Sequence, residues 1–186
     1  MAKLIYIANV SLDGFIEDAS GSFDFTEPDE EVFLFITDLV RSVGIWLYGR
    51  RLYEAMAVWE TDASLAAQSE PMADFANVWQ AGEKIVYTTT LQAAPTARTR
   101  LERSFDPDSV RDMKASATAD LTVGGANLAA QAFEAKLVDE CHLFISPVLV
   151  GGGKPALPRD TRAKLELVDE RRFASGVVYL RYRNPT

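Results

Sequence analysis

The stretch LTVGGANLAAQAF (residues 121–133) passes from an apolar run through two adjacent glycines into an alanine-rich segment. This pattern predicts a strand over 120–123 and a helix over 126–136, joined at Gly124 and Gly125. The glycines have two purely structural interpretations, which are a tight turn and a close approach of two backbones. The third interpretation is functional: a phosphate meets the start of the helix, where free N–H groups and a partial positive charge attract anions.

A second segment, IWLYGRRLYEAM (residues 45–56), repeats the order of strand, glycine and helix, with Gly49 at the junction. Arg50 and Arg51 follow this glycine directly and add positive charge. Ligands of open α/β sheets gather at the carboxyl ends of the strands, so two such junctions predict a site for two parts of a dinucleotide. A third expected strand end carries the threonines at 88–90, whose hydroxyls suit a ribose or a phosphate.

The two common phosphate-binding motifs are not found at these junctions. The segment VGGAN (residues 123–127) lacks the G-x-G-x-x-G spacing, and GGGK (residues 151–154) is not followed by a Ser/Thr helix start. The sequence therefore predicts a dinucleotide site of a different kind. Glycines that serve the fold alone remain the alternative, and this alternative predicts no dinucleotide binding.

The rest of the chain alternates between apolar runs and amphipathic segments. The expected strands cover 3–10, 44–49, 84–88, 120–123 and 138–150, and the expected helices cover 27–43, 50–59, 71–82, 106–115 and 126–136. Residues 89–105 and 151–158 are expected to be loops, and 164–183 to be an antiparallel pair. This order predicts the α/β class, with a mostly parallel central sheet and an antiparallel C-terminal edge in a single three-layer domain over 1–186.

Several helix ends support these assignments. Pro28 and the acids after it suit a helix start, and so do Asp106 as an N-cap and Pro107 in the first turn. Gly82 marks the end of the helix over 71–82. The first helix is expected to bury one apolar stripe, made of Val32, Ile36, Leu39, Val40 and Val43.

Composition excludes several classes of protein. The 186 residues are 48% hydrophobic, which supports a folded core, and the formal charge of −8 argues against a nucleic-acid backbone as main partner. Cys141 is the single cysteine and His142 the single histidine, so neither a disulfide framework nor a Cys/His metal site is expected. No secretory signal and no bilayer-length apolar stretch is recognised, so we expect a cytoplasmic protein without a membrane partner.

Four segments in this order carry a family resemblance: VSLDGFI (10–16), GRRLYEAM (49–56), VGGANL (123–128) and LVDECHLFISPVLVGGGKPAL (137–157). Together they resemble the dihydrofolate reductase superfamily, most closely the branch of the reductase domain of the bacterial deaminase-reductase of riboflavin biosynthesis. The resemblance covers nearly the whole chain. It implies a dihydrofolate reductase-like domain that binds NADPH across the carboxyl ends of its strands and passes a hydride to a small pterin-like or aminopyrimidine-type heterocycle.

The resemblance also assigns cofactor-binding residues, motif by motif. It implies that the cofactor phosphates meet Gly49, Arg50, Arg51 and Leu52, and that the adenosine ribose meets Thr88 and Thr89. It implies that the pyrophosphate and nicotinamide meet Gly124, Gly125, Ala126, Asn127 and Leu128, and that Ala8, Asp13, Gly14, Phe15 and Ile16 line the nicotinamide. Arg50 or Arg51 then favours the 2′-phosphate of NADPH through a charge-assisted contact.

Catalytic and substrate-binding residues are assigned less directly. Relatives hold the substrate ring with an acid near the start of the first helix, where this chain has Glu31, our first choice, and Glu30. Asp13 is a further catalytic candidate, with a turn residue as the alternative. Two aromatic residues are assigned to the substrate, namely Tyr6 and Trp59, with core packing as the alternative for Trp59.

Three further expectations concern charge, partners and function. Arg98, Arg100 and Arg103 form a basic cluster that either binds the adenosine phosphate or faces solvent. Relatives in this branch often pair, so a homodimer is expected, with CHLFISPVLV (141–150) and the C-terminal strand pair as its interface. The main alternative to an NADPH-dependent reductase is an NADPH-binding module with little or no catalysis.

Overall fold

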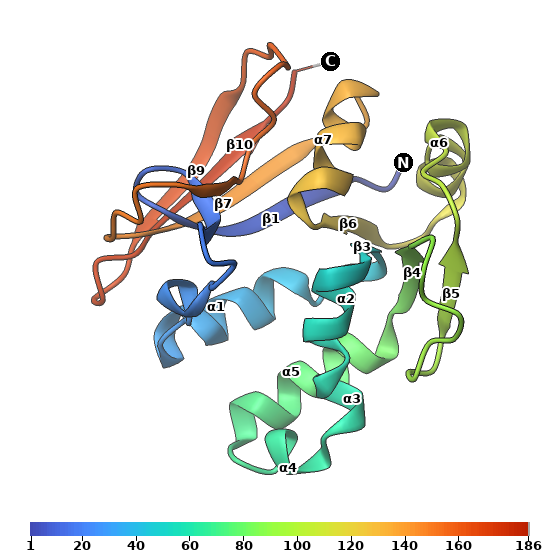
Figure 1. Cartoon of the computed structure of the whole chain (residues 1–186), viewed down its shortest axis with the longest axis horizontal. Coiled ribbons are helices and arrows are strands. Elements are labelled where there is room, and N and C mark those ends of the chain that lie inside the picture. The colour runs from blue at the N-terminus through green and yellow to red at the C-terminus, as the bar shows by residue number, and fades with distance from the viewer. Residues whose placement is uncertain (186) are drawn as a thin grey trace.

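An eight-stranded sheet forms the centre of the computed structural model, which describes residues 1–185. Its strand order is β5-β4-β3-β6-β1-β7-β10-β9 (Figure 1). The strands are β1 (Leu4–Ser11), β3 (Val43–Gly49), β4 (Glu83–Tyr87), β5 (Thr99–Glu102), β6 (Asp120–Gly124), β7 (Glu140–Ser146), β9 (Glu166–Arg172) and β10 (Val178–Arg183). All pairs from β5 to β7 are parallel, and β10 pairs antiparallel with β7 and β9. The predicted mostly parallel sheet with an antiparallel C-terminal edge is therefore confirmed.

Two strands lie where loops were predicted, and a third lies where no element was assigned. β5 falls inside the expected loop 89–105, and β8 (Gly153–Pro155) falls inside the expected loop 151–158. β8 pairs with the unassigned strand β2 (Phe15–Asp18) in a small antiparallel sheet. These segments are three or four residues long and lack a continuous apolar run, so their local sequence does not distinguish them from loops. They become strands because a partner lies alongside. The backbone of β8 approaches so closely that a Cβ on Gly153 would lie 2.0 Å from the Glu17 carbonyl oxygen.

The longer helices agree with the predicted pattern, with differences before residue 30 and between residues 40 and 66. The helices are η1 (Asp24–Thr26), α1 (Glu30–Val40), α2 (Arg50–Met56), α3 (Val58–Thr61), α4 (Ala63–Ala66), α5 (Glu70–Ala81), α6 (Pro107–Ser116) and α7 (Ala126–Glu134). The single helix expected over 50–59 is divided into α2 and α3, and α4 was not predicted. Val43, expected on the stripe of the first helix, instead begins β3, because α1 already ends at Val40.

Helix caps form where acidic and hydroxyl side chains precede the first turn. Asp29 accepts a hydrogen bond of 2.9 Å from the Val32 amide and caps α1. Ser69 caps α5, and Asp106 caps α6 with Pro107 in its first turn, as the sequence predicted. These caps fix where α1, α5 and α6 begin.

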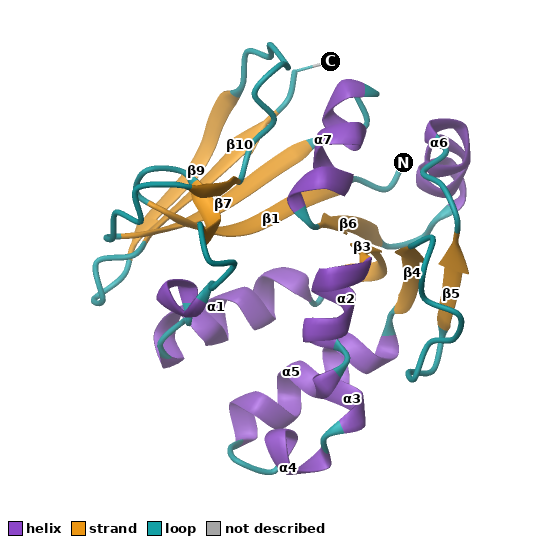
Figure 2. Cartoon of the chain, in the orientation of Figure 1, coloured by secondary structure: helices purple, strands orange, loops and turns teal. Residues whose placement is uncertain are grey.

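Helices cover both faces of the sheet, which gives the three predicted layers (Figures 1 and 2). On one face, α1, α2 and α5 pack over aromatic residues of the sheet, among them Trp46, Tyr48, Phe144 and Tyr179. On the other face, α6 and α7 pack over an aliphatic cluster that includes Leu4, Leu47, Leu121 and Val123. The two faces thus have separate cores, and the carboxyl ends of β3, β6 and β1 lie between them.

Candidate functional site

The two glycine junctions lie side by side. β3 and β6 are neighbouring strands, and Tyr48 pairs with Gly124 at their carboxyl ends. A Cβ built on Gly125 would lie 3.7 Å from the backbone nitrogen of Gly49. Two segments that are far apart in the sequence therefore meet at one edge of the sheet, as the α/β pattern predicted.

Gly124 and Gly125 are required for different structural reasons. A Cβ on Gly124 would lie 2.5 Å from Cδ2 of Leu52 and 3.2 Å from the Tyr48 ring, so this glycine allows α2 to pack closely on β6. Gly125 instead has a φ of +94°, a conformation that favours glycine, and precedes the first residue of α7 without any side-chain cap. Close packing thus explains Gly124, while Gly125 leaves the amides at the start of α7 without a capping side chain.

The next residues of α7 divide between packing and exposure. Ala126 and Leu128 are buried and hold the first turn of the helix against the sheet. Asn127 is exposed between them. Of these three predicted cofactor residues, Asn127 alone offers a side-chain polar group at the junction.

The two arginines after Gly49 diverge. Arg50 pairs with Glu54 one turn along α2, at 3.3 Å. Arg51 reaches the other way and pairs with Glu17 of β2, also at 3.3 Å. The Arg51 side chain remains 63% exposed, so its guanidinium has donors available at the rim of the junction.

The third strand end is closed by its own hydrogen bonds. The Thr88 hydroxyl accepts bonds from the amides of Thr90 (3.2 Å) and Leu91 (3.1 Å). Arg103 donates to the carbonyl oxygens of Thr88 (3.1 Å) and Leu91 (2.8 Å). Thr88 is thus buried and serves the turn, while Thr89 is exposed.

The expected basic cluster of three arginines is divided by β5. Arg103 lies beyond the carboxyl end of this strand, near Thr88, whereas Arg98 and Arg100 lie at its amino end. The structure therefore leaves Arg103 alone of the three close to the predicted adenosine region.

The loop after β1 is held by Asp13. This carboxylate accepts bonds from the amides of Gly151 (2.8 Å) and Val150 (3.2 Å), and Ala156 donates to the Gly14 carbonyl oxygen at 2.9 Å. The pKa of Asp13 is lowered, chiefly by the Ser11 hydroxyl and then by these backbone amides. Asp13 is therefore an anion that ties two loops together, which suits a structural role better than proton donation.

The remaining predicted nicotinamide contacts lie beside these loops. Ala8 is buried in the aliphatic cluster on the α7 side of the sheet. Phe15 and Ile16 begin β2 and are half-buried, and Gly14 precedes them with a φ of +91°. Phe15 and Ile16 thus remain partly accessible, whereas the Ala8 side chain is packed.

One of the two predicted substrate contacts lies in a core, which corrects its assignment. Tyr6 is 1% exposed, and its hydroxyl donates to the Ala156 carbonyl oxygen at 2.6 Å. Burial raises the pKa of this phenol, so it stays protonated and bonded to the loop. Trp59 is half-buried and packs against Phe33 and Phe75 in the helical layer, with ring centroids 5.9 and 4.7 Å away. Packing thus accounts for Tyr6, while substrate contact stays a prediction for the partly exposed Trp59.

The acids of the first helix face two directions. Glu31 accepts a bond of 2.9 Å from Arg171 of β9 and one of 3.2 Å from the Ala174 amide, so it joins α1 to the β9–β10 turn. The Arg171 guanidinium also lies 4.8 Å from the centre of the Phe173 ring. Glu30 is exposed at the first residue of α1. The structure thus brings Glu31 together with Arg171, a partner that the sequence did not predict.

Asn9 was missed by the sequence analysis. In β1, a strand enclosed by β6 and β7, every residue is buried except Ile7 and Asn9, which are half-buried. A polar residue inside the apolar run KLIYIANV is the signal that points to it. Asn9 adds an amide to the carboxyl end of the central strand.

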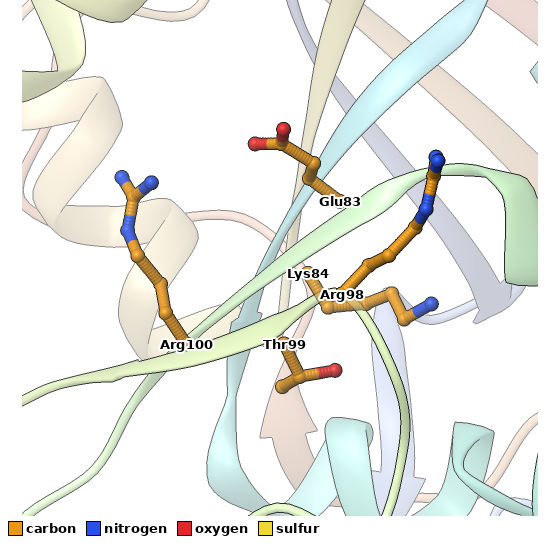
Figure 3. Close-up of a pocket in the computed structure, with 5 residues that line it drawn as sticks. All are labelled: Glu83, Lys84, Arg98, Thr99 and Arg100. Atoms are coloured by element: carbon orange, nitrogen blue, oxygen red, sulfur yellow. The ribbon is translucent and has the colours of Figure 1, made fainter.

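A surface cleft of about 410 Å³ lies elsewhere, at the amino ends of β4 and β5. Figure 3 shows the guanidinium groups of Arg98 and Arg100 pointing to opposite sides of it. Lys84 is fully buried there and donates to the Gly82 carbonyl oxygen at 3.2 Å, with its ammonium 4.4 Å from the Trp79 ring centre. These cations do not converge on a common point, so the glycine junctions remain the candidate site.

Each helix within residues 1–185 is too short or too polar to span a bilayer. These residues also contain no group of three or more His, Cys, Asp or Glu side chains arranged to hold a metal ion.

Comparison with known proteins gives one family and one curated relative. The profile of the RibD C-terminal domain matches residues 2–179. The chain is 28% identical over 182 residues to the uncharacterized protein YyaP of Bacillus subtilis, covering 97% of this chain and 94% of that protein.

Solved structures share the fold across the whole chain. A putative riboflavin biosynthesis protein from Shewanella sp. PV-4 has a TM-score of 0.78 at 19% identity, with 100% of both chains covered. A pyrimidine reductase-like protein from Corynebacterium diphtheriae has a TM-score of 0.64 at 14% identity, covering 100% of this chain and 92% of that one. A deaminase/5-amino-6-(5-phosphoribosylamino)uracil reductase from Thermotoga maritima has a TM-score of 0.65 at 14% identity, covering 99% of this chain and 57% of that one.

Proposed function

The chain belongs to the RibD C-terminal domain family, and from this premise we propose that it is an NADPH-dependent reductase of a small pterin-like or aminopyrimidine-type heterocycle. The observation that carries the proposal is the meeting of the two glycine junctions. A Cβ atom on Gly125 would lie 3.7 Å from the backbone nitrogen of Gly49. A backbone without side chains at this edge lets a pyrophosphate approach the amides at the start of α7.

The residues at this edge fit a dinucleotide. The amides at the start of α7 are proposed to hold the pyrophosphate, beside Asn127 and Gly49. Arg51, with donors free at the rim, is proposed to bind the 2′-phosphate, and Thr89 the adenosine ribose. NADPH, when bound, supplies the hydride, and the chain's own part is to orient the two rings and to exclude water.

A proton must also reach the reduced substrate. The candidates within this proposal remain Glu31 and then Glu30, acting directly or through a water that they position. Arg171 and the Ala174 amide each bond one oxygen of the Glu31 carboxylate, and this geometry favours the water-mediated route for Glu31. Asp13 holds the two loops at the nicotinamide end through backbone amides.

A pair of glycine variants tests the cofactor site. Gly125→Ala adds a methyl group beside Gly49, whereas Gly176→Ala adds one in the β9–β10 turn at a similar φ of +88°. Both carry a similar backbone strain. NADPH is titrated by tryptophan fluorescence. We expect Gly125→Ala to bind NADPH about tenfold or more weakly than wild type, with Gly176→Ala unchanged. A folded wild type that binds neither NADPH nor NADH overturns the proposal.

An NADPH-binding module with little catalysis is the second candidate. The observation in its favour is that Glu31 is already paired with Arg171. Glu31→Gln and Glu30→Gln separate the two functions, because the reductase predicts lost turnover with NADPH affinity intact. If wild type also turns over none of a panel of heterocycles, that result favours the NADPH-binding module.

We also propose that the protein is a cytoplasmic homodimer that pairs through its C-terminal strands. All residues of β9 are exposed, including Leu167 at 55% and Val168 at 47%. Apolar side chains on an open sheet edge favour an interface between chains. Light scattering after size exclusion should give a dimer for wild type and a monomer for Leu167→Asp, and a monomeric wild type contradicts the proposal.

A further inference from the structure

Asn9 occupies an unusual place for a polar side chain. β1 lies fifth in the order of the eight-stranded sheet that residues 1–185 form, where strands are normally sealed on both faces. Asn9 and Ile7 are nevertheless half-buried while their neighbours in the strand are buried. The covering layer is therefore open above these two residues.

Ile7 and Asn9 lie on the face of the sheet that α1 packs against. Ile7 packs with the clusters beneath α1, and side chains alternate along a strand, so Asn9 points to the same side as Ile7. Ala8 and Val10, between and beyond them, belong to the opposite cluster under α7. The Asn9 amide thus faces the space beside the first helix.

The strands on either side of Asn9 differ. On one side Asn9 pairs with Phe144 of β7, a residue 1% exposed beneath Phe35 of α1. On the other side the pairing of β1 with β6 ends at Tyr6 and Val123, one residue before the glycine junction. Asn9 therefore lies between the α1-covered part of the sheet and the proposed cofactor site.

The side-chain amide of Asn9 is not used by the protein. The hydrogen bonds within residues 1–185 include none to it, whereas the hydroxyl of Ser11, two residues on, accepts a bond of 2.9 Å from the Phe15 amide. Asparagine is also disfavoured in strands, so the β-propensity of the residue does not explain its presence here. Neither packing nor internal hydrogen bonding accounts for asparagine at this position.

We infer that Asn9 determines substrate specificity by pairing with a lactam edge, an N–H next to a C=O, on the heterocycle. Its carbonyl oxygen accepts from the ring N–H and its NH₂ donates to the ring carbonyl, which gives two parallel bonds. This inference rests on the proposed reductase function and narrows its substrate class to rings that carry such an edge.

Matched ligands and variants test the pairing. The ligands are 5-aminouracil and its N1,N3-dimethyl analogue, which has no ring N–H, titrated by calorimetry into protein saturated with NADPH. The proteins are wild type, Asn9→Ala, Asn9→Asp, and Asn77→Ala as a control at an exposed asparagine of α5. NADPH affinity is measured for each protein first.

We expect 5-aminouracil to bind wild type and Asn77→Ala alike, and to bind Asn9→Ala and Asn9→Asp about tenfold or more weakly. The N1,N3-dimethyl analogue should bind wild type with a similar loss and show little further loss in Asn9→Ala, because both changes remove one interaction.

Two results overturn the inference while leaving the cofactor site standing. One is equal 5-aminouracil affinity for wild type and Asn9→Ala when both bind NADPH. The other is a wild type that binds NADPH but does not bind 5-aminouracil, or binds the two ligands equally. Failure of wild type to bind NADPH is a different result, which overturns the proposed function and this inference with it.

Discussion

At one end of strands β1 and β7 the polar groups are hydrogen-bonded within the protein, and at the other end they are not. At the amino end, Glu140 is 4% exposed and accepts bonds from Lys3 (2.7 Å), Arg181 (2.9 and 3.0 Å) and His142 (3.0 Å). At the carboxyl end, the side-chain amide of Asn9 has no hydrogen-bond partner within residues 1–185. The start of α7, which follows the neighbouring strand β6, has no capping side chain. A polar group that is satisfied internally supports the fold, whereas one left open at an accessible edge is available to a ligand.

At the amino end of β7, Glu140, His142 and Tyr179 belong to one closed hydrogen-bond network. The Tyr179 hydroxyl and His142 Nδ1 are 2.9 Å apart, and Nε2 of the same ring meets Glu140. Burial lowers the pKa of His142, so the imidazole is neutral at pH 7, with Nε2–H donating to Glu140 and Nδ1 accepting from Tyr179. Each ring nitrogen thus has one role, and no donor is left for a ligand.

The largest expected effect breaks this closed network. Glu140→Ala leaves the half-buried Arg181 and the exposed Lys3 without their anion, and it leaves buried His142 without an acceptor for Nε2. It should lower the free energy of unfolding by about 3 kcal/mol in urea titrations. Glu166→Ala removes an exposed pair with Arg183 and should cost about 1 kcal/mol or less. Equal losses in the two variants would contradict the distinction between closed and open polar groups.

The same network should make stability depend on pH. Burial alone would raise the pKa of Glu140, but hydrogen bonds from Arg181, Lys3 and His142 outweigh it and lower the pKa from 4.5 to about 2. A lowered carboxyl pKa stabilises the fold above the unfolded value, and this contribution, about 3 kcal/mol, is lost as the pH falls from about 5 to 2. Urea titrations at several pH values should show a smaller acid loss in Glu140→Gln than in wild type. Parallel curves would contradict this assignment.

Gly124 lies at the carboxyl end of β6, beside the proposed cofactor site, but its role is in packing. A variant at Gly124 therefore tests how much that end contributes to stability. Gly124→Ala places a methyl group against Leu52 and Tyr48 and should cost about 1–3 kcal/mol of stability. Adding Leu52→Ala should relieve part of that cost, so the double variant should be more stable than the sum of single losses predicts. Additive losses in urea titrations would show that the contact does not limit the packing.

The smallest expected effect separates the two arginines. Arg51→Gln should weaken NADPH binding about tenfold relative to NADH, because the 2′-phosphate loses its proposed charge-assisted contact. Arg50→Gln should change both affinities little, since Arg50 pairs with Glu54 along its own helix. Fluorescence titration of both nucleotides measures the ratio. A larger ratio change in Arg50→Gln would reverse the roles of the two residues.

Much of the fold could be predicted because its signals are local. The apolar run of β1, the caps at Asp29 and Asp106, and the glycines after β3 and β6 each depend on residues close in the chain. The strand β5 could not be predicted, since its pairing with β4 provides what its own four residues lack.

The candidate site was predicted unevenly for the same reason. The glycine junctions are local motifs, and their meeting follows from the order of parallel strands. The core position of Tyr6, the packing of half-buried Trp59 and the bond between Glu31 and Arg171 depend on segments far apart in the sequence. Asn9 carried a local signal, a polar residue in an apolar strand, but its meaning depends on which neighbours cover it.

The sequence by itself determined the α/β class, the sheet with its antiparallel edge, and the two glycine junctions, because hydrophobic period and glycine conformation act over a few residues. The tertiary structure alone decided which polar groups are satisfied. Glu140 is closed off because Lys3 and Arg181 reach it from 137 and 41 residues away, while the Asn9 amide stays open because no group within residues 1–185 bonds it. Hydrogen-bond satisfaction is a property of distant neighbours, so no local pattern encodes it.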